Sequence, residues 1–348
     1  MRIALDAMGG DHAPQAMVQG AFDYARAHTA DTILLVGQED RLRSAISAEA
    51  NPPSNIEVVH ASQVIGMADK LEALKEFPDD SMNVSARLVK EGKADGMVLC
   101  GNTGCSVGAA QLHLRRIPGA KRAGILVPLP KPSGHTWLCD GGANAVGKPE
   151  HLAQFGAMAA AYVETTLGKK RPGVGVLSIG EEEGKGNELT AETLDLLKGT
   201  DLNVLGFVEG HDIYRRDDLD VVVCDGFTGN IVLKTSEGVE AALRQVIKEE
   251  IKRTVLGTLG GALVKPAFQR VKERVDWRYV GGCILLGVNG VCVIGHGRSD
   301  RLAVFNALRQ AGDCVTSKLV AKLHDAVKTV RIAEPSPAPA PSAAAPQA

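Results

Sequence analysis

Residues 225–234 read DGFTGNIVLK and directly follow the apolar run Val221–Cys224. This order predicts that a buried strand ends, a tight glycine turn follows, and a helix begins near Thr228. The first turn of such a helix carries unpaired backbone N–H groups at the positive end of the helix dipole, where an anion is stabilised. Asn230 would add a neutral donor and Lys234 a positive charge one turn later, so the stretch is a candidate anion site.

Two further stretches repeat this order of strand, glycine loop and helix. They are VLCGNTG at 98–104 and LCDGGANAVGK at 138–148, and a fourth glycine-rich loop, GEEEGKGNE, lies at 180–188. Loops beyond the carboxyl ends of parallel strands share one edge of the sheet, so we expect these corners to converge on one anion, although a single such corner often only turns the chain. The candidate phosphate-binding residues are Asn102, Thr103, Gly104, Asn144, Lys148, Asn187, Asp225, Thr228, Gly229 and Lys234.

Composition and motifs exclude several classes of protein. The 348-residue chain is 45% apolar, enough for a sizeable core, and its formal net charge of -2 and 4% aromatic content argue against nucleic-acid binding. The glycine loops match neither the P-loop nor the G-x-G-x-x-G pattern, which argues against a nucleotide site. Seven scattered cysteines indicate neither a disulfide framework nor zinc, and the amino terminus lacks signal-peptide features. We therefore expect a cytoplasmic protein without metal or organic cofactor.

Short apolar runs alternate with helix-length segments along most of the chain, which predicts βαβ units in an α/β fold with a largely parallel sheet. Strands are expected at 124–127 and 136–139, joined by a proline-broken loop, and one last helix over 301–330. An apolar segment at 255–264 is expected to precede a separate basic helix at 266–274.

The carboxyl terminus is compositionally distinct from the rest of the chain. Residues 333–348 are mostly proline and alanine, with little apolar surface to bury, and are expected to be disordered. The catalytic α/β domain is accordingly expected to span residues 1–332.

Histidines, aspartates and cysteines beside these loops offer further chemistry. His12 and His296 are the leading candidates for proton transfer or oxyanion binding. The aspartates Asp6, Asp11, Asp140 and Asp225 could hold a metal, but helix capping and orientation of neighbouring groups are favoured, because carboxylates repel phosphate. A covalent thioester on Cys100, Cys139 or Cys224 is conceivable, but small buried side chains at strand ends are the favoured interpretation.

Six motifs together resemble, in order, those of the PlsX family, the bacterial acyl-ACP:phosphate acyltransferases. They are MRIALDAMGGDHAP at 1–14, GNTG at 101–104, DGGANAVGKPEHL at 140–152, GEEEGKGNELT at 180–190, DGFTGNIVLK at 225–234 and GHGRSD at 295–300. The resemblance implies transfer of a long-chain fatty acyl group from acyl carrier protein (ACP) to inorganic phosphate, giving an acyl phosphate for phospholipid synthesis. It also implies a three-layer α/β/α fold related to phosphate acetyl- and butyryltransferases and to isocitrate-type dehydrogenases.

The resemblance further implies a homodimer that associates peripherally with the cytoplasmic membrane and supplies a glycerol-3-phosphate acyltransferase. The family's membrane-associating helical hairpin falls at about 228–280. Its apolar and basic residues fit an anionic membrane surface or acidic ACP, with burial in the core as the alternative. The expected contact residues are Leu256, Leu259, Leu263, Lys252, Arg253, Lys265 and Arg270.

For the mechanism, the sequence favours phosphate itself as the nucleophile, since no convincing pair of nucleophile and base is evident. Lys185 and Lys234 are the expected cations, and Asn230, His12 and His296 are candidates for stabilising the oxyanion or the leaving thiol. Three alternatives remain open at this point. They are a CoA-dependent phosphate acyltransferase, a metal- and NAD-dependent hydroxy-acid dehydrogenase on the related scaffold, and a non-catalytic anion sensor.

Overall fold

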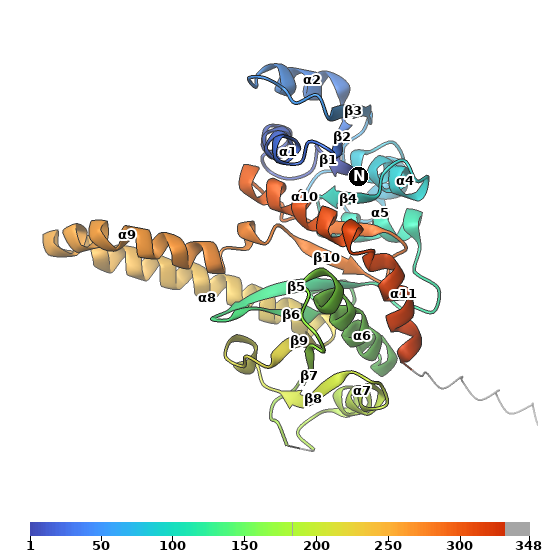
Figure 1. The fold of residues 1–348 in the computed structure, drawn as a ribbon, viewed down its shortest axis with the longest axis vertical. Helices are drawn as coiled ribbons and strands as arrows, with labels where there is room; N and C mark the ends of the chain where they lie inside the picture. The colour runs from blue at the N-terminus through green and yellow to red at the C-terminus, as the bar shows by residue number, and fades with distance from the viewer. Residues whose placement is uncertain (183, 331–348) are drawn as a thin grey trace, which may run out of the picture.

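One continuous sheet organises the protein, which we describe from a computed structural model covering residues 1–182 and 184–330. The sheet has eleven strands in the order β3-β2-β1-β4-β11-β10-β5-β6-β9-β7-β8 (Figure 1). The strands are β1 (Arg2–Asp6), β2 (Thr32–Gly37), β3 (Ile56–His60), β4 (Gly96–Leu99), β5 (Gly124–Lys131), β6 (Gly134–Cys139), β7 (Gly173–Leu177), β8 (Asn203–Val208), β9 (Leu219–Val223), β10 (Cys283–Leu286) and β11 (Val291–Ile294). The expected tail at 333–348 lies outside the described residues.

Helices cover both faces of the sheet, which confirms the expected three layers. One face carries α1 (Gln15–Ala27), α6 (Pro149–Thr166), α7 (Glu188–Lys198), α10 (Arg301–Thr316) and α11 (Leu319–Thr329). The other carries α4 (Ser81–Lys90), α5 (Thr103–Leu114), the short α3 (Ala73–Glu76) and the start of α8; α2 (Glu39–Ser47) lies beside β2 and β3. Alternate residues of β1 divide between the two layers, because successive side chains of a strand point to opposite faces.

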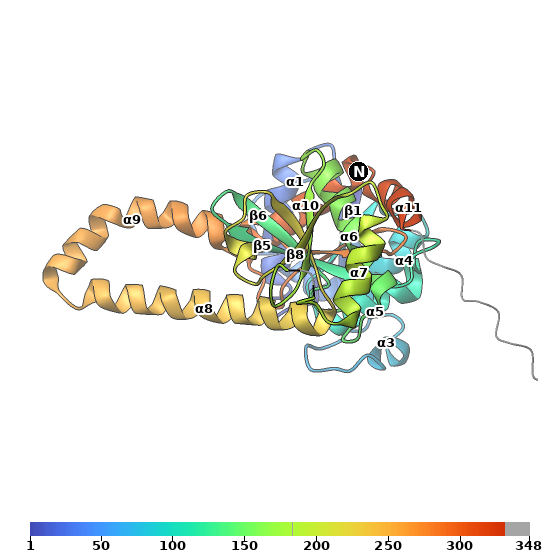
Figure 2. The same ribbon diagram turned by 90° about the horizontal axis from the view of Figure 1, so that it is seen from below.

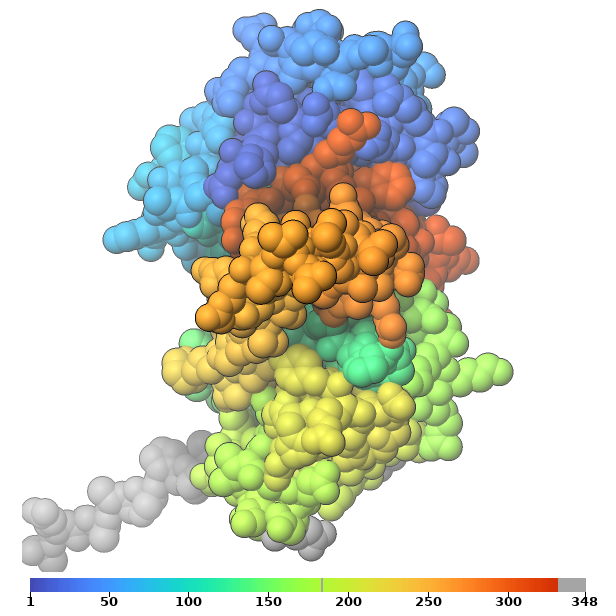
Figure 3. All heavy atoms as spheres, turned by 90° about the vertical axis from the view of Figure 1, so that its left-hand side faces the viewer, coloured from blue at the N-terminus to red at the C-terminus, as the bar shows by residue number. Residues whose placement is uncertain are grey.

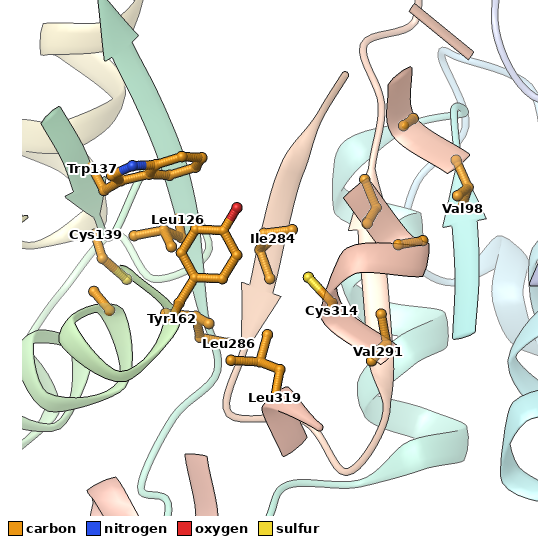
Figure 4. Close-up of a cluster of buried hydrophobic side chains, with 14 of the residues drawn as sticks. Val98, Leu126, Trp137, Cys139, Tyr162, Ile284, Leu286, Val291, Cys314 and Leu319 are labelled. Carbon is orange, nitrogen blue, oxygen red and sulfur yellow. The ribbon is translucent and has the colours of Figure 1, made fainter. Parts of the chain in front are cut away.

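The core is closely packed on the α6 side. The indole of Trp137 on β6 meets the ring of Tyr162 on α6 edge to face, with centroids 4.8 Å apart. Leu126 of β5 and Ile284 of β10 lie against the same pair of rings (Figure 4). These contacts fix the middle of the sheet, from which the candidate site loops extend.

The sheet is mixed, and three antiparallel pairings lie at its centre. β11 pairs antiparallel with β10, β10 with β5, and β5 with β6, whereas the pairings outside this centre are parallel. The two parallel parts of the sheet therefore run in different directions. Loops that follow strands in one part do not share an edge with loops of the other part.

A long antiparallel pair of helices projects from the body of the molecule (Figures 1 and 2). Helix α8 spans Gly226–Lys252 and α9 spans Val255–Val275, and the short η2 (Trp277–Tyr279) leads back to β10. We call residues 226–275 the arm. Viewed from the side, the arm lies over the middle of the molecule, between the N-terminal part and the part formed by residues 170–225 (Figure 3).

Three expectations about elements were wrong. The strands at 124–127 and 136–139 are one continuous hairpin, β5–β6, which includes Pro128 and Pro130. The apolar segment at 255–264 and the basic helix at 266–274 are a single helix, α9, with Pro266 inside it. The expected last helix over 301–330 is two helices, because Lys318 adopts a left-handed conformation with φ 54° between α10 and α11.

Candidate functional site

Three loops that follow β1, β4 and β11 meet at one end of their strands. We call residues 7–14, 100–104 and 295–300 the first loop cluster. The N–H of Asp11 donates to the carbonyl of Gly297 at 2.8 Å. Gly10, with φ 91°, brings its backbone so close that a Cβ would lie 2.8 Å from the Gly297 carbonyl oxygen. Only glycine fits at position 10, because any side chain would clash with the Gly297 carbonyl. Gly10 therefore allows the MGGDHAP and GHGRSD motifs to contact each other.

The buried carboxyl of Asp6, at the end of β1, orders the backbone of the first loop cluster. Asp6 is fully buried, and its Oδ1 accepts from the N–H groups of Met8 and Gly9 at 3.1 Å each. No geometric hydrogen bond reaches its Oδ2 from the residues that the structure describes, and burial raises the pKa of this carboxyl although Ser81 lies close enough to oppose the shift. A Cβ at Gly9 would lie 2.3 Å from Asp6 Oδ2 and 2.6 Å from the Gly101 nitrogen, so the GNTG loop lies directly against the loop after β1.

The loops that follow β6 and β9 form a second group. We call residues 140–148 and 225–230 the second loop cluster. The N–H of Gly226 donates to the carbonyl of Asn144 at 2.9 Å. A Cβ at Gly229 would lie 2.0 Å from the carbonyl oxygen of Asp140. The DGGAN and DGFTGN corners therefore touch each other through their backbones, as the sequence predicts.

Asp140 holds the second loop cluster together. Its carboxylate is fully buried and accepts hydrogen bonds from backbone N–H groups and from the Asn144 amide, all at 2.8–3.0 Å. The backbone donors are those of Ile125, Gly142, Ala143 and Asn144. Asp225 likewise caps α8 by accepting from the N–H of Thr228 at 2.8 Å. Asp6, Asp140 and Asp225 thus have the capping and orienting roles that the sequence favours over metal ligation. Among the described residues, no group of histidine, cysteine and acidic side chains is arranged to hold a metal ion.

The two clusters lie at different ends of the central strands. The bond from Ile125 N–H to Asp140 places the second loop cluster beside the beginning of β5, whereas the first follows the ends of β4 and β11. The GKGNE loop follows β7, the neighbour of β9, so Lys185 lies on the side of the second loop cluster. The structure therefore does not bring Lys185 and Asn187 next to the GNTG loop.

Helix α8 connects the two clusters. It begins at Gly226 in the second loop cluster and packs along β5 and β6. Eight residues later, about 12 Å along the helix axis, it presents Lys234. Lys234 forms an ion pair with Glu237 at 3.0 Å, and both residues lie within electrostatic reach of His296 in the first loop cluster. Lys234 is thus the predicted cation that the structure brings close to a predicted histidine.

His296 has a defined tautomer and a neutral ring. The N–H of Arg298 donates to its Nδ1 at 3.1 Å, so the ring proton resides on Nε2, which can donate to a ligand. Burial is the main cause that lowers the pKa of His296, and the charge of Arg298 lowers it further. The ring of Trp277 lies over His296 with centroids 5.1 Å apart. The result is a neutral N–H donor held in a fixed plane.

His12 is exposed at the start of α1, beside Asp11 and Arg301 in a shallow surface hollow. It shares the first loop cluster with His296, and no side-chain hydrogen bond of His12 is found among the described residues.

Several predicted phosphate ligands have side chains that form hydrogen bonds to other groups of the protein. The Asn102 amide donates to the carbonyls of Met67 and Asp69, and its oxygen caps α5. The Asn144 amide donates to the Ala123 carbonyl and to Asp140, and the Asn187 oxygen caps α7. Their role is to shape the corners.

Other candidates remain open to a ligand. Thr103 and Gly104, in the first turn of α5, are exposed, and so are Asn230 and Lys185. Thr228, Lys148 and Gly229 line the second loop cluster, where Lys148 precedes α6 and Gly229 is buried. The open helix start nearest to His296 along the sheet is that of α5, because β4 and β11 are neighbours.

Cysteine chemistry finds no support in the structure. Cys100, Cys139 and Cys224 are buried. Burial raises the pKa of Cys100 to about 12 and raises the pKa of Cys139 and Cys224 well above the ordinary value of a thiol. Since the thiolate is the nucleophile, these three side chains act as small buried packing groups.

Trp277, Arg278 and Glu237 lie next to the site, and sequence reasoning did not identify them. Trp277 and Arg278 belong to the segment DWRY at 276–279, which matches none of the six motifs. The one local signal is that an aromatic residue stands next to an arginine just after an expected helix. Many surface segments have this pattern, so it does not indicate a functional role.

Comparisons with known proteins agree with this architecture. A family model described as "Fatty acid synthesis protein" matches residues 1–322. The chain is 44% identical over 324 residues to a phosphate acyltransferase of Desulfitobacterium hafniense (strain DSM 10664 / DCB-2), which covers 93% of this chain and 96% of the relative. It is 43% identical over 331 residues to a phosphate acyltransferase of Aquifex aeolicus (strain VF5), with 95% and 98% covered.

Solved structures share the fold at low sequence identity. The EutD phosphotransacetylase from Staphylococcus aureus superposes with a TM-score of 0.57 at 18% identity, covering 94% of each chain. A branched-chain phosphotransacylase from Enterococcus faecalis V583 gives a TM-score of 0.53 at 14% identity, covering 90% of this chain and 99% of the other. These likenesses bear on the fold, and the family rests on the sequence matches. The chain belongs to the phosphate acyltransferase family and is an acyltransferase.

Proposed function

We propose that the protein transfers a long-chain fatty acyl group from the thioester of acyl carrier protein to inorganic phosphate, giving an acyl phosphate for phospholipid synthesis. The observation that carries this proposal is the neutral His296, whose Nε2–H has no partner within residues 1–182 and 184–330 and which Lys234 reaches electrostatically. It lies in the same loop cluster as the open start of α5. In this proposal the start of α5 supplies the anion site and His296 the oxyanion donor, which are the two elements that phosphate acylation needs.

Phosphate is held, in this proposal, by the first turn of α5 with Lys234 as the counter-charge. The N–H groups of Thr103 and Gly104 have no partner in the helix, because the first N–H groups of a helix never do. The second loop cluster, with Thr228, Gly229, Asn230 and Lys148, lies at the start of α8 and is proposed to contact the acyl donor. Lys185 and Asn187 follow β7, on the same side as that cluster.

The chemistry proceeds by direct attack. A phosphate oxygen forms the new bond to the thioester carbonyl carbon, and the carbon–sulfur bond breaks as the tetrahedral intermediate collapses. The Nε2–H of His296 donates to the carbonyl oxygen while it carries negative charge, and Asn230 and His12 are further candidate donors. The leaving thiol has an ordinary pKa near 8.5, so it departs as thiolate and takes a proton from water. Holding the two reactants together contributes on the order of 7–11 kcal/mol.

The arm supplies the proposed contact with the membrane and with acidic ACP. Leu256, Leu259 and Leu263 lie at helical spacing on α9 and are 82%, 61% and 83% exposed. The neighbouring basic residues are Lys252, Arg253, Lys265 and Arg270. None of the helices in the described part of the chain is long and apolar enough to cross a bilayer. An exposed apolar row with basic flanks suits peripheral binding to an anionic surface.

Replacing Leu256 and Leu259 with Asp is expected to weaken binding to anionic vesicles about 100-fold or more, since each buried leucine contributes about 2 kcal/mol. Vesicle flotation measures the binding, and activity on a water-soluble donor is expected to stay within twofold. Gln245→Asp with Gln269→Asp adds the same charge at exposed polar positions of the arm and serves as the matched control. Equal binding by the two double variants would show that the leucines make no membrane contact.

The proposed assembly is a homodimer that passes its product to a glycerol-3-phosphate acyltransferase. An acyl phosphate is a reactive mixed anhydride, so it can acylate the hydroxyl of glycerol 3-phosphate in the next reaction. The closest alternative is a phosphate acyltransferase that uses acyl-CoA as donor. The fold by itself is compatible with both donors.

One assay tests the proposed function. The protein is incubated with acyl-ACP and phosphate, and acyl phosphate is trapped as the hydroxamate; a parallel reaction contains acyl-CoA. We expect phosphate-dependent hydroxamate with acyl-ACP at a kcat/KM at least tenfold above that with acyl-CoA. A preference for acyl-CoA would support the alternative, and no hydroxamate with either donor would reject acyl transfer to phosphate.

A further inference from the structure

We propose that Trp277 and Arg278, where the arm returns to the sheet, are positioning residues that hold His296 in its reactive orientation. The inference rests on the proposed role of His296 as an oxyanion donor. It assigns a task to the DWRY segment, which neither the motifs nor the family match explains.

Arg278 joins the end of the arm to the first loop cluster. Its guanidinium donates to Asp276 through Nε at 3.0 Å and through Nη2 at 2.6 Å, and its Nη1 donates to Asp300 Oδ2 at 2.7 Å. The other oxygen of Asp300 caps α10 by accepting from the N–H of Ala303 at 3.1 Å. The planar guanidinium therefore fixes Asp300, the last residue of the GHGRSD loop, relative to Asp276, the residue that directly follows the arm.

His296 is fixed on its backbone side and on its ring side by different groups. The hydroxyl of the buried Ser299 donates to the His296 carbonyl at 2.6 Å, and the N–H of Arg298 donates to the ring. The indole of Trp277 packs against the ring in a tilted arrangement, with centroids 5.1 Å apart and an interplanar angle of 34°. Without the indole, the ring could rotate about its side-chain torsions and lose the direction of its Nε2–H.

Both ends of the arm meet at this histidine. Trp277 of η2 contacts the ring of His296. The charged groups near the ring are Lys234 and Glu237 of α8, Asp11 of the loop after β1, and Arg298 of its own loop. A change in the position of the arm would therefore alter the surroundings of His296 in two ways, through Lys234 and Glu237 of α8 and through Trp277. Binding of the arm to a surface is expected to alter kcat through this junction.

The test compares Trp277→Ala, Trp277→Phe and Arg278→Gln with the parent protein. We expect Trp277→Ala and Arg278→Gln to lower kcat 10- to 100-fold while KM for phosphate changes less than threefold. Trp277→Phe, which keeps an aromatic face, is expected to restore kcat to within threefold. The acid limb of the kcat profile is expected to move to higher pH in Trp277→Ala, because less burial raises the pKa of His296.

Arg309→Gln is the matched control. Arg309 donates to the Tyr279 carbonyl and to Asn306, so its loss loosens the same junction without touching the GHGRSD loop. Its kcat is expected to stay within twofold. In a Trp137→Phe background Trp277 is the only tryptophan, and its fluorescence is expected to titrate with His296.

Two outcomes separate this inference from the proposed function. If His296→Ala abolishes turnover while Trp277→Ala and Arg278→Gln match Arg309→Gln in kcat and pH profile, the positioning role is wrong and the function stands. If His296→Ala retains full activity, the proposed role of the histidine fails and the positioning role fails with it.

Discussion

Replacement of His296 with Ala is expected to lower kcat for acyl phosphate formation about 100- to 1000-fold, the usual effect of removing one oxyanion donor. KM for phosphate is expected to change little, because the donor acts on the acyl carbonyl and its bond strengthens in the transition state. His296→Gln retains an N–H donor at a similar reach and is expected to recover part of kcat. The measurement is initial-rate kinetics with varied phosphate and varied acyl donor.

The pH dependence of the parent protein follows from the same histidine. Burial lowers the pKa of His296, so the ring stays neutral to more acidic pH than an ordinary histidine. Activity should therefore persist below the usual titration range of histidine and fall when the ring is protonated, because a proton on Nδ1 breaks the hydrogen bond from the Arg298 N–H that orients the ring. His324→Ala, which changes a half-buried histidine on α11, should leave both rate and profile unaltered. A parent-like profile in His296→Ala would mean that another group titrates.

Asp140→Ala is expected to lower the free energy of unfolding by about 3–5 kcal/mol, the range found when a buried charged partner is removed. Five donors would lose their acceptor at once: three backbone N–H groups and the Asn144 amide in the second loop cluster, and the N–H of Ile125 at the start of β5. Urea unfolding measures the loss. Asp225→Ala, which removes one cap on α8, is the comparison and should cost only about 1 kcal/mol. Equal losses in the two variants would mean that water or rearrangement replaces the Asp140 contacts.

Much of the fold was predictable because local signals and the final structure agree. Asp80 caps α4 through the N–H of Met82 at 2.8 Å, and Pro149 occupies the first turn of α6, positions that the local preferences of aspartate and proline favour. The failures occur where neighbours override a local rule. Pro128 and Pro130 remain in β5 because β10 pairs only with residues 124–126, so their missing N–H groups face no second strand.

The continuity of α9 through Pro266 escaped prediction for a related reason. Pro266 is usually expected to break a helix, since it removes one hydrogen bond and crowds the preceding turn. In α9 no neighbouring layer of the body constrains the helix, and none of its residues is buried, so it can bend locally and continue. At Lys318 the opposite happens: the helix breaks although no glycine or proline indicates it, because Lys318 adopts a left-handed conformation.

The site was predicted in its parts but not in its arrangement. The glycine corners form, and DGGAN meets DGFTGN as expected. The expectation that all corners share one edge assumed a sheet that is parallel throughout. The three antiparallel pairings around β10 and β5 separate GNTG from the other corners, and only the length of α8 brings Lys234 back to His296. Sequence spacing reports loops, whereas strand direction decides which loops meet.

Direct attack by phosphate is the central claim, and one single-turnover experiment tests it. Excess enzyme is mixed with acyl-ACP carrying a labelled acyl group, and samples are quenched with and without phosphate. We predict that without phosphate the label stays on ACP, and that with phosphate thiol release and acyl phosphate appear at the same rate. A labelled protein that accumulates without phosphate and then releases its acyl group when phosphate is added would contradict the account.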